Sequence, residues 1–402
     1  MKYKLSDLTI DGKGSYGIAA SAVEYDPNKY TYLRITDIND DGTINFDGLK
    51  SVDDENAGKY ILKENDIVFA RTGASTGRTY FYQKKDGVFV FAGFLIKYSL
   101  DPNKVNPRFL KYYTHSKTYY DWVRSFDSGA TRGNINAKTF GDMLIDLPER
   151  FVQDKIVSIL SDLDDKIECN RKICANLEAQ AQALFKNWFV DFAPFKDGKF
   201  VESELGMIPE GWRVGRLSEL ATKVGSGGTP SSKVKEYYQG GIKWYGTGEF
   251  NDSFLIDSEK HISDEALDNS AAKIFPSHTV LIAMYGATVG KLSILTSEAS
   301  FNQAALGFVA NDIVKYPFLY LSLMFNRKSL VQLACGAAQQ NLNAGVIKSH
   351  QTIIPHESVF ANFNSIIIPI FDRIEVMTKE NLRLATLRDT LLPKLMSGEI
   401  KI

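Results

Sequence analysis

The sequence contains two copies of one short motif. Residues 128–136 read SGATRGNIN and residues 335–343 read CGAAQQNLN, so both fit G-A-x-x-x-N-[IL]-N. A proline follows each copy at the same distance, Pro148 in the first and Pro355 in the second. The copies lie roughly two hundred residues apart, a spacing that indicates one internal duplication and not an array of short repeats. We therefore expect two related modules.

Three further pairs of segments match in the same order along the chain. LSDL returns as LSEL, YLRITDI is matched by WYGTGEF, and ARTGASTGR returns as AMYGATVGK; the pairs occupy residues 5–8 and 217–220, 32–38 and 244–250, and 70–78 and 283–291. The second pair sets Asp37 against Glu249. The third pair fits A-x-x-G-A-x-x-G-[RK]. Because the matches keep their order with only small insertions, coincidence is a poor explanation for them.

The amino-acid composition and the periodicity of each copy change at its proline. The residues before it are rich in Tyr, Phe, Ile, Val and Gly, with short apolar runs such as DIVFA and HTVLIAMY, which predict strands separated by glycine turns. The residues after it follow a heptad pattern for about five heptads, which is typical of a coiled coil. The predicted seam positions are Ile156, Leu160, Leu163, Ile167, Asn170, Cys174, Leu177, Ala181, Leu184 and Trp188, then Phe363, Ile367, Ile370, Ile374, Met377, Asn381, Leu384, Arg388, Leu391 and Leu395.

The two helices can cover each other's apolar seam. Antiparallel pairing about a pseudo-twofold axis is the natural arrangement for a duplicated unit. Asn170 and Asn381 would then lie almost opposite one another, where they either fix the register or reach solvent. Pro369 is expected to kink or restart the second helix, and Pro393 to kink or end it near the last turn.

These patterns predict an α+β fold with two mixed α/β domains separated by two long helices that form an antiparallel coiled coil. The predicted segments are a first domain at 1–149, a first helix at 150–190, a connector at 191–212, a second domain at 213–356, and a second helix with the C-terminal tail at 357–402.

Composition narrows the class of protein. A chain of 402 residues with 44% hydrophobic and 24% charged residues is typical of a globular protein of two or three domains. We expect a cytoplasmic location, because no apolar run reaches the length of a membrane span and the start MKYKLSDLTI is not that of a signal peptide. Cys169, Cys174 and Cys335 are expected to be reduced thiols. The net charge of −1 excludes a uniformly basic surface but allows local basic strips.

The glycine motifs do not predict catalysis. YGATVGKL lacks the first glycine of a phosphate loop and has Leu292 where a Ser or Thr would hold magnesium. The five histidines make no H-x-x-x-H pair and have no cysteine companions, so no metal site is expected. The chain also has no motif for methyl transfer to the adenine amino group. The segment NPRF, which begins at Asn106, comes near to it but has Arg108 where the second proline belongs. The sequence therefore predicts no catalytic, cofactor or metal site.

The loops instead carry side chains that suit DNA. Arg and Lys bind phosphates or guanine, and Asn and Gln can pair with adenine. The candidate DNA-binding residues are Arg34, Arg71, Thr72, Ser75, Arg78, Thr131, Arg132, Asn134, Asn136 and Lys138 in the first copy, and Lys243, Tyr285, Thr288, Lys291, Gln339, Gln340, Asn341 and Asn343 in the second.

The candidates fall into shared and varied positions. The four asparagines recur in both copies, so they either brace the loop or read bases. Arg71 is matched by Met284, and Arg132 by Gln339, which makes these positions better candidates for sequence reading. Two modules with one frame and different variable residues are expected to read two different short sequences.

The chain resembles the specificity subunits of type I restriction-modification systems. The resemblance rests on LFKNWFVDFAPF at 184–195, SELGMIPEGW at 203–212, GSGGTPS at 225–231 and LLPKLMSGEI at 391–400, together with the paired glycine motifs. It covers essentially the whole chain, including the order of its segments. The first copy departs from the pattern, because it has GKGSYGIAA at 12–20 and no counterpart of GSGGTPS.

The resemblance implies a subunit that catalyses nothing itself. Each domain would read one half of a split target in double-stranded DNA, and the helices would set the unread spacer. The subunit would hold two modification subunits, which bind S-adenosylmethionine and methylate adenine, and could recruit motor-nuclease subunits that use ATP and Mg²⁺. Phe185, Trp188 and Phe189 would dock the modification subunits or pack against their own connector. The alternative is a duplicated coiled-coil scaffold without DNA specificity.

Overall fold

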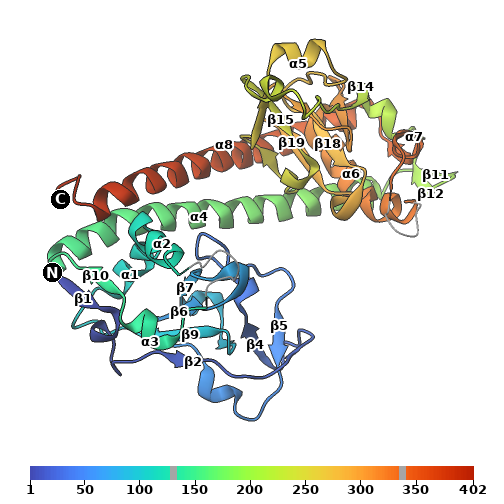
Figure 1. Cartoon of the computed structure of the whole chain (residues 1–402). Helices are drawn as coiled ribbons and strands as arrows, with labels where there is room; N and C mark the ends of the chain where they lie inside the picture. Colours follow the sequence, from blue (N-terminus) through green and yellow to red (C-terminus); the bar gives the residue numbers. More distant parts are fainter. Residues whose placement is uncertain (127–133, 335–340) are drawn as a thin grey trace. The chain divides into compact units, whose positions relative to one another are not determined.

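The computed structural model describes residues 1–126, 134–334 and 341–402. The chain divides into two compact units (Figure 1). Unit 1 comprises Met1–Asp165 and Leu384–Ile402, and unit 2 comprises Lys166–Arg383. The predicted segments and the compact units are different divisions of the chain, because each unit combines a β-rich region with part of both long helices. Within the described ranges, no helix has the length and apolarity that a membrane crossing requires.

Unit 1 contains two four-stranded sheets and a short antiparallel pair. The first sheet has the order β2-β9-β6-β7 and the second the order β3-β5-β4-β8, in which β4 and β8 are parallel. Strand β1 pairs with β10. The strands are β1 (Lys2–Lys4), β2 (Ser15–Tyr16), β3 (Ala22–Val23), β4 (Tyr30–Leu33), β5 (Lys50–Val52), β6 (Asp66–Ala70), β7 (Thr79–Phe81), β8 (Phe89–Phe91), β9 (Leu95–Ser99) and β10 (Leu144–Asp146); the helices are α1 (Pro107–Tyr113), α2 (Lys117–Arg124) and α3 (Ala137–Gly141).

Unit 2 has a five-stranded sheet, β14-β21-β18-β19-β16, and a three-stranded sheet, β17-β15-β20. Two antiparallel pairs, β13-β22 and β11-β12, complete it. The strands are β11 (Phe200–Ser203), β12 (Gly206–Pro209), β13 (Arg213–Arg216), β14 (Ala221–Ser226), β15 (Ile242–Tyr245), β16 (Phe254–Leu255), β17 (Lys260–Ile262), β18 (Val280–Ala283), β19 (Leu292–Leu295), β20 (Ser300–Phe301), β21 (Ala305–Ala310) and β22 (Gln351–Ile354); the helices are α5 (Asp264–Asp268), α6 (Lys315–Gln332) and α7 (Ala344–Ser349).

The two units share one topology, which confirms the predicted duplication. The order β2-β9-β6-β7 of unit 1 corresponds to β14-β21-β18-β19 of unit 2, and the parallel pair β4-β8 corresponds to β15-β20. The predicted match of Asp37 with Glu249 holds in detail. The amide of Arg34 donates to the Asp37 carboxylate, and that of Gly246 donates to the Glu249 carboxylate, both at 2.8 Å.

Residues 12–20, which lack the letters GSGGTPS, nevertheless contain a structural equivalent of that motif. The amide of Gly17 donates to the carbonyl of Leu95 at 3.2 Å, and the amide of Gly227 donates to that of Ala305 at 3.3 Å, from equivalent strands. A Cβ atom would lie 2.3 Å from a backbone oxygen at Gly17 and 2.0 Å from one at Gly227. Both positions therefore need glycine because another backbone approaches closely, a requirement that the surrounding letters do not reveal.

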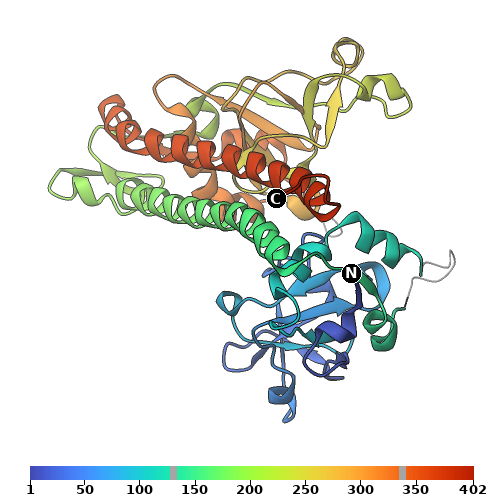
Figure 2. The same cartoon turned by 90° about the vertical axis from the view of Figure 1, so that its left-hand side faces the viewer.

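The two long helices are α4 (Arg150–Phe189) and α8 (Glu357–Met396), of 40 residues each. Both views show them side by side (Figures 1 and 2). Every predicted seam position is buried or half-buried, so the heptad pattern identified the packed face correctly. Arg388, the charged residue of the seam, is held there because its guanidinium donates to the Asp164 carboxylate at 3.0 Å.

The helices are antiparallel. In unit 1, Ile156 from the start of α4 shares a core with Leu395 from the end of α8. In unit 2, Ala181 from the second half of α4 shares a core with Phe363 from the first turns of α8. This pairing is the one predicted from the sequence.

The expected restart of the second helix at Pro369 does not occur. Helix α8 runs without interruption through Pro369 and ends at Met396, three residues beyond Pro393. Proline removes one amide donor, a cost that packing on both sides can offset. Ile367 and Phe371 flank Pro369 and are both buried in the core of unit 2, while Pro369 itself is exposed.

A polar contact lies within the helix seam. Asn170 is fully buried, and its Nδ2 donates to Oε2 of Glu380 at 2.7 Å and to Oδ1 of Asn381 at 3.0 Å. The alternative that Asn170 reaches solvent is therefore wrong. Its own Oδ1 is buried with no hydrogen-bond partner among the described residues. A buried, incompletely satisfied amide lowers stability but can fix the register, which stays a hypothesis for this pair.

We expect Asn170→Leu to raise the free energy of unfolding by about 1 kcal/mol, because it replaces an unsatisfied buried amide with an apolar side chain. Chemical denaturation of the two forms measures the difference. Asn176→Leu is a control, since Asn176 is exposed on the same helix. A large loss of stability in Asn170→Leu would show that the Asn170 contacts stabilise the seam as well as specifying it.

Candidate DNA interface

The repeated glycine motif forms the same turn in both units. It joins β6 to β7 in unit 1 and β18 to β19 in unit 2, each time through a single 3-10 turn. The first glycines, Gly73 and Gly286, both have φ of 74°, and the second ones, Gly77 and Gly290, have φ of 87° and 80°. These left-handed values favour glycine strongly.

The second glycine is also required by packing. A Cβ atom at Gly77 would lie 2.6 Å from Val123 of α2, and one at Gly290 would lie 2.7 Å from Val331 of α6. Each turn is thus pressed against a helix of its own unit. A rigid frame of this kind can present side chains in a fixed geometry.

The described end of the second repeated motif, residues 134–136 and 341–343, contacts the first motif. The amide of Ile135 donates to the carbonyl of Arg71 at 3.0 Å, and the amide of Leu342 donates to that of Met284 at 2.8 Å. Ile135 and Leu342 are the middle residues of N-I-N and N-L-N, and both are buried. The structure therefore brings together, in each unit, the two motifs that the sequence singled out. We call the described part of each such pair, residues 70–78 with 134–136 and residues 283–291 with 341–343, a reading frame.

The last asparagine of each motif caps a helix. The side-chain oxygen of Asn136 accepts from the amide of Thr139 at 2.9 Å, at the start of α3. That of Asn343 accepts from the amide of Gly345 at 2.7 Å, at the start of α7. Such caps support the bracing interpretation for these two residues. Asn134 and Asn341 are exposed, and a role in reading bases stays a prediction for them.

The varied position within the reading frame, Arg71 in unit 1 and Met284 in unit 2, differs in burial and surroundings between the units. Arg71 is half-buried, with its guanidinium carbon 5.1 Å from the centre of the Tyr16 ring. Its Nε is buried without a hydrogen-bond partner in the described parts of the chain. Met284 is only 1% exposed and belongs to the core of unit 2, so it is not available to DNA in this structure. Its neighbour Tyr285 is 40% exposed.

Several predicted basic residues have partners within their own unit. Arg34 forms two hydrogen bonds to the Asp37 carboxylate, at 2.9 and 2.6 Å, and these contacts raise the pKa of Arg34. Arg78 donates from Nε to Asp40 at 2.6 Å. Lys243 donates to a backbone carbonyl at 2.5 Å. These three residues can reach phosphate only by exchanging or sharing those partners.

The other predicted residues are distributed as follows. Thr72 and Thr288 are half-buried, and Ser75, the last residue of the 3-10 turn of unit 1, is buried. Lys138 and Lys291 are exposed. The remaining four, Thr131, Arg132, Gln339 and Gln340, lie outside the described residues.

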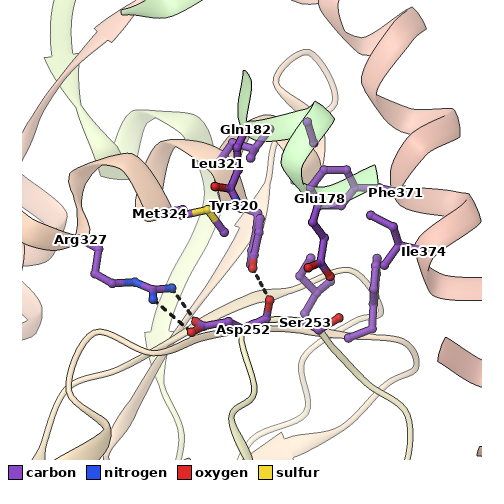
Figure 3. Close-up of a pocket in the computed structure, with 13 residues that line it drawn as sticks. Glu178, Gln182, Asp252, Ser253, Tyr320, Leu321, Met324, Arg327, Phe371 and Ile374 are labelled. Carbon is purple, nitrogen blue, oxygen red and sulfur yellow. Dashed lines mark hydrogen bonds and ion pairs between the residues drawn. The ribbon is translucent and has the colours of Figure 1, made fainter. Parts of the chain in front are cut away.

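An ion pair that the sequence analysis missed supports the turn of unit 2. Arg327 of α6 donates twice to Asp252, at 3.1 and 2.5 Å, and the Tyr320 hydroxyl donates to the Asp252 carbonyl (Figure 3). Asp252 in turn accepts from the amide of Leu292, the residue after the glycine turn, at 2.8 Å. The sequence held one signal for Asp252. This aspartate stands two residues after WYGTGEF, just as Asp40 stands two residues after the matching segment YLRITDI.

The same group of side chains lines a cavity of about 340 Å³ between α4, α6, α8 and the sheet. Glu178 faces this cavity from α4 (Figure 3). Burial, and after it the nearby Asp252 carboxylate, raises the pKa of Glu178. Across the described residues, no three His, Cys, Asp or Glu side chains are grouped so that they could hold a metal ion.

The model of the type I restriction-modification DNA specificity domain matches the chain twice, at residues 1–179 and 209–383. The chain belongs to this family. It is the DNA specificity subunit of a type I restriction-modification system, part of a complex that recognises DNA, and is itself non-catalytic. The resemblance drawn from the sequence is thereby confirmed.

Related proteins agree with the family model. The chain is 29% identical over 299 residues to the type I restriction enzyme MjaIX specificity subunit of Methanocaldococcus jannaschii, covering 73% of this chain and 69% of that one. It is 28% identical over 409 residues to the HindI specificity subunit of Haemophilus influenzae, covering 85% and 88%. The crystal structure of the type I S subunit from M. genitalium superposes with a TM-score of 0.56 at 17% identity, covering 98% and 95%, which supports the predicted fold.

Proposed function

We propose that each unit reads one half of a bipartite DNA target through its reading frame. The observation that carries this proposal is that one backbone geometry recurs with different side chains. Arg71 and Thr72 occupy the positions that Met284 and Tyr285 occupy in unit 2, on turns with the same φ values at their first glycines. A shared frame with varied side chains is suited to recognising two different short sequences.

The long helices have a different part in this proposal. Helices α4 and α8 set the unread spacer between the half-targets and hold two modification subunits, which supply S-adenosylmethionine and methylate adenine. Restriction would need motor-nuclease subunits in addition. The continuous 40-residue length of both helices and their buried seam support this part of the proposal. The alternative of a scaffold without DNA specificity is wrong, because both copies match the DNA specificity domain.

Sequencing of host DNA for N6-methyladenine tests the proposal. The strain carries the cognate modification subunit, and the gene for this chain is either present or deleted. We expect a two-part motif with an unread spacer that disappears on deletion. A continuous motif, or a motif that persists without the gene while the modification subunit is expressed, would contradict the proposal.

Arg71→Ala should weaken methylation of the cognate target by roughly 5- to 160-fold and relax one position of one half-target, because a direct base contact contributes about 1–3 kcal/mol. Methylation rates on the cognate site and on its single-base variants measure both effects. Arg108→Ala is the control, since Arg108 is an exposed arginine of unit 1 on α1, outside the reading frame. An unchanged methylation rate and an unchanged base preference would remove Arg71 from the reading residues.

A further inference from the structure

Phe94 is an exposed aromatic side chain beside the glycine turn of unit 1. It lies between β8 and β9 and is 58% exposed. Single exposed apolar residues are common on protein surfaces and by themselves indicate nothing. Phe94 differs because its backbone is bonded to the reading frame: its carbonyl accepts from the amide of Arg71 at 3.1 Å.

The backbone around Phe94 is held on both sides. The amide of Leu95 donates to Ala92 across the turn at 2.8 Å, and the carbonyl of Leu95 accepts from Gly17. Arg71, which bonds to Phe94, also lies over the ring of Tyr16, and Tyr16 is itself 42% exposed. An exposed aromatic residue is thus joined, through its backbone, to the residue that carries the guanidinium.

Unit 2 has the same backbone geometry with a different side chain. The amide of Met284 donates to the carbonyl of Ala304 at 2.7 Å, as that of Arg71 does to Phe94. The following residue, Ala305, donates back to Asn302 at 3.2 Å, as Leu95 does in unit 1. Phe94 and Ala304 are therefore equivalent positions. The two units therefore share this backbone geometry but carry a phenyl ring in one case and a methyl group in the other.

We propose that Phe94 is a specificity-determining residue that contacts the C5-methyl group of a thymine in the half-target of unit 1. Apolar side chains, phenylalanine among them, recognise this methyl group in the major groove. The neighbouring Arg71 would contact phosphate or a guanine edge at the adjacent position. The inference rests on the proposed function, that unit 1 reads one half of the target.

The test is a double-mutant cycle between the protein and its DNA. One partner is Phe94→Ala in the complete complex, and the other is the cognate duplex with deoxyuridine in place of each thymidine of the half-target in turn. Deoxyuridine keeps the base-pairing edge and lacks only the methyl group. At one thymidine of the half-target, we expect Phe94→Ala alone and deoxyuridine alone each to lower kcat/KM for methylation about tenfold. At that same thymidine, the two changes together should lower it by no more than either alone.

The control variant is Phe46→Ala, since Phe46 is 57% exposed in unit 1 and lies in the separate connection between β4 and β5. We expect Phe46→Ala to leave methylation unchanged at every thymidine. Both variants remove an exposed ring, so equal melting temperatures will show that both are folded.

Three results would overturn the inference. One is unchanged methylation by the complex that carries Phe94→Ala. Another is that the losses from Phe94→Ala and from deoxyuridine add at every thymidine, as expected if the ring acted as a wedge or contacted a partner protein. The third is a half-target without thymidine on either strand. Failure of the proposed function is recognised separately, because the methylation motif would then not depend on residues 1–149 at all.

Discussion

Replacing Phe189 with alanine will lower the free energy of unfolding of unit 2 by about 4 kcal/mol. Phe189 is 6% exposed at the end of α4. Its ring lies 4.8 Å from that of Phe363, 4.9 Å from that of Phe318 and 5.8 Å from that of Trp212, measured between centroids. Truncation would leave a cavity among rings from three other segments of the chain, which cannot readily collapse.

Hydrogen exchange followed by mass spectrometry can measure this loss within unit 2, because exchange of buried amides such as those of α6 reports the local free energy of opening. Val190→Ala is the matched control, since Val190 is the next residue and is 48% exposed. The result also distinguishes two roles for the aromatic end of α4. Weaker binding of the modification subunit with unchanged exchange would favour docking and contradict the packing role that burial indicates.

Replacing Asp164 with asparagine will destabilise unit 1 by about 3 kcal/mol at neutral pH. Asp164 lies on α4, and its carboxylate accepts from Lys111 at 2.6 Å, Tyr112 at 2.9 Å and Arg388 at 3.0 Å. Its side chain is 19% exposed, and those of Lys111 and Arg388 are 27% and 25% exposed. The substitution would leave two partly buried cations without their shared anion.

The effect should depend on pH in one direction. Burial by itself would raise the pKa of Asp164, but Lys111, Arg388 and the Tyr112 hydroxyl outweigh burial and hold the pKa below its usual value. A lowered carboxylate pKa stabilises the folded state above the unfolded pKa of about 3.9, and that contribution is lost as the pH falls through the folded pKa. The stability gap between wild type and Asp164→Asn should therefore be constant above about pH 5 and narrow in stronger acid.

Denaturation with urea at several pH values measures this gap. Asp165→Asn is the control, because Asp165 is the adjacent carboxylate on α4 and is exposed. A gap that stayed the same below about pH 3, or a loss of stability as large in Asp165→Asn, would contradict the assigned role of Asp164.

The helices and the duplication could be predicted because their signals are periodic or repeated. A seam sustained over 40 residues is strong enough that even Asn170 and Arg388, which are polar, were placed correctly. The strands gave weaker signals, since many of them have only two to four residues. Their sheet order depends on pairings between distant segments, such as β2 with β9, that no local pattern specifies.

The candidate interface was predicted in part. The sequence identified both motifs of the reading frame, but it did not show that one docks on the other, because the contact is between backbone atoms of Ile135 and Arg71. It also treated Arg71 and Met284 as equivalent reading positions, whereas Met284 is buried. Phe94 was missed because its importance comes from a hydrogen bond of its carbonyl, which any residue type can make.

An exchange of residues 1–149 tests the central claim most directly. The segment is replaced by the corresponding residues of a specificity subunit with a different known target, and host DNA carrying the chimera and the cognate modification subunit is sequenced for N6-methyladenine. We predict that one half of the methylated motif changes, while the other half and the spacer stay the same. A motif that changes in both halves, or in neither, would contradict the division of recognition between the two units.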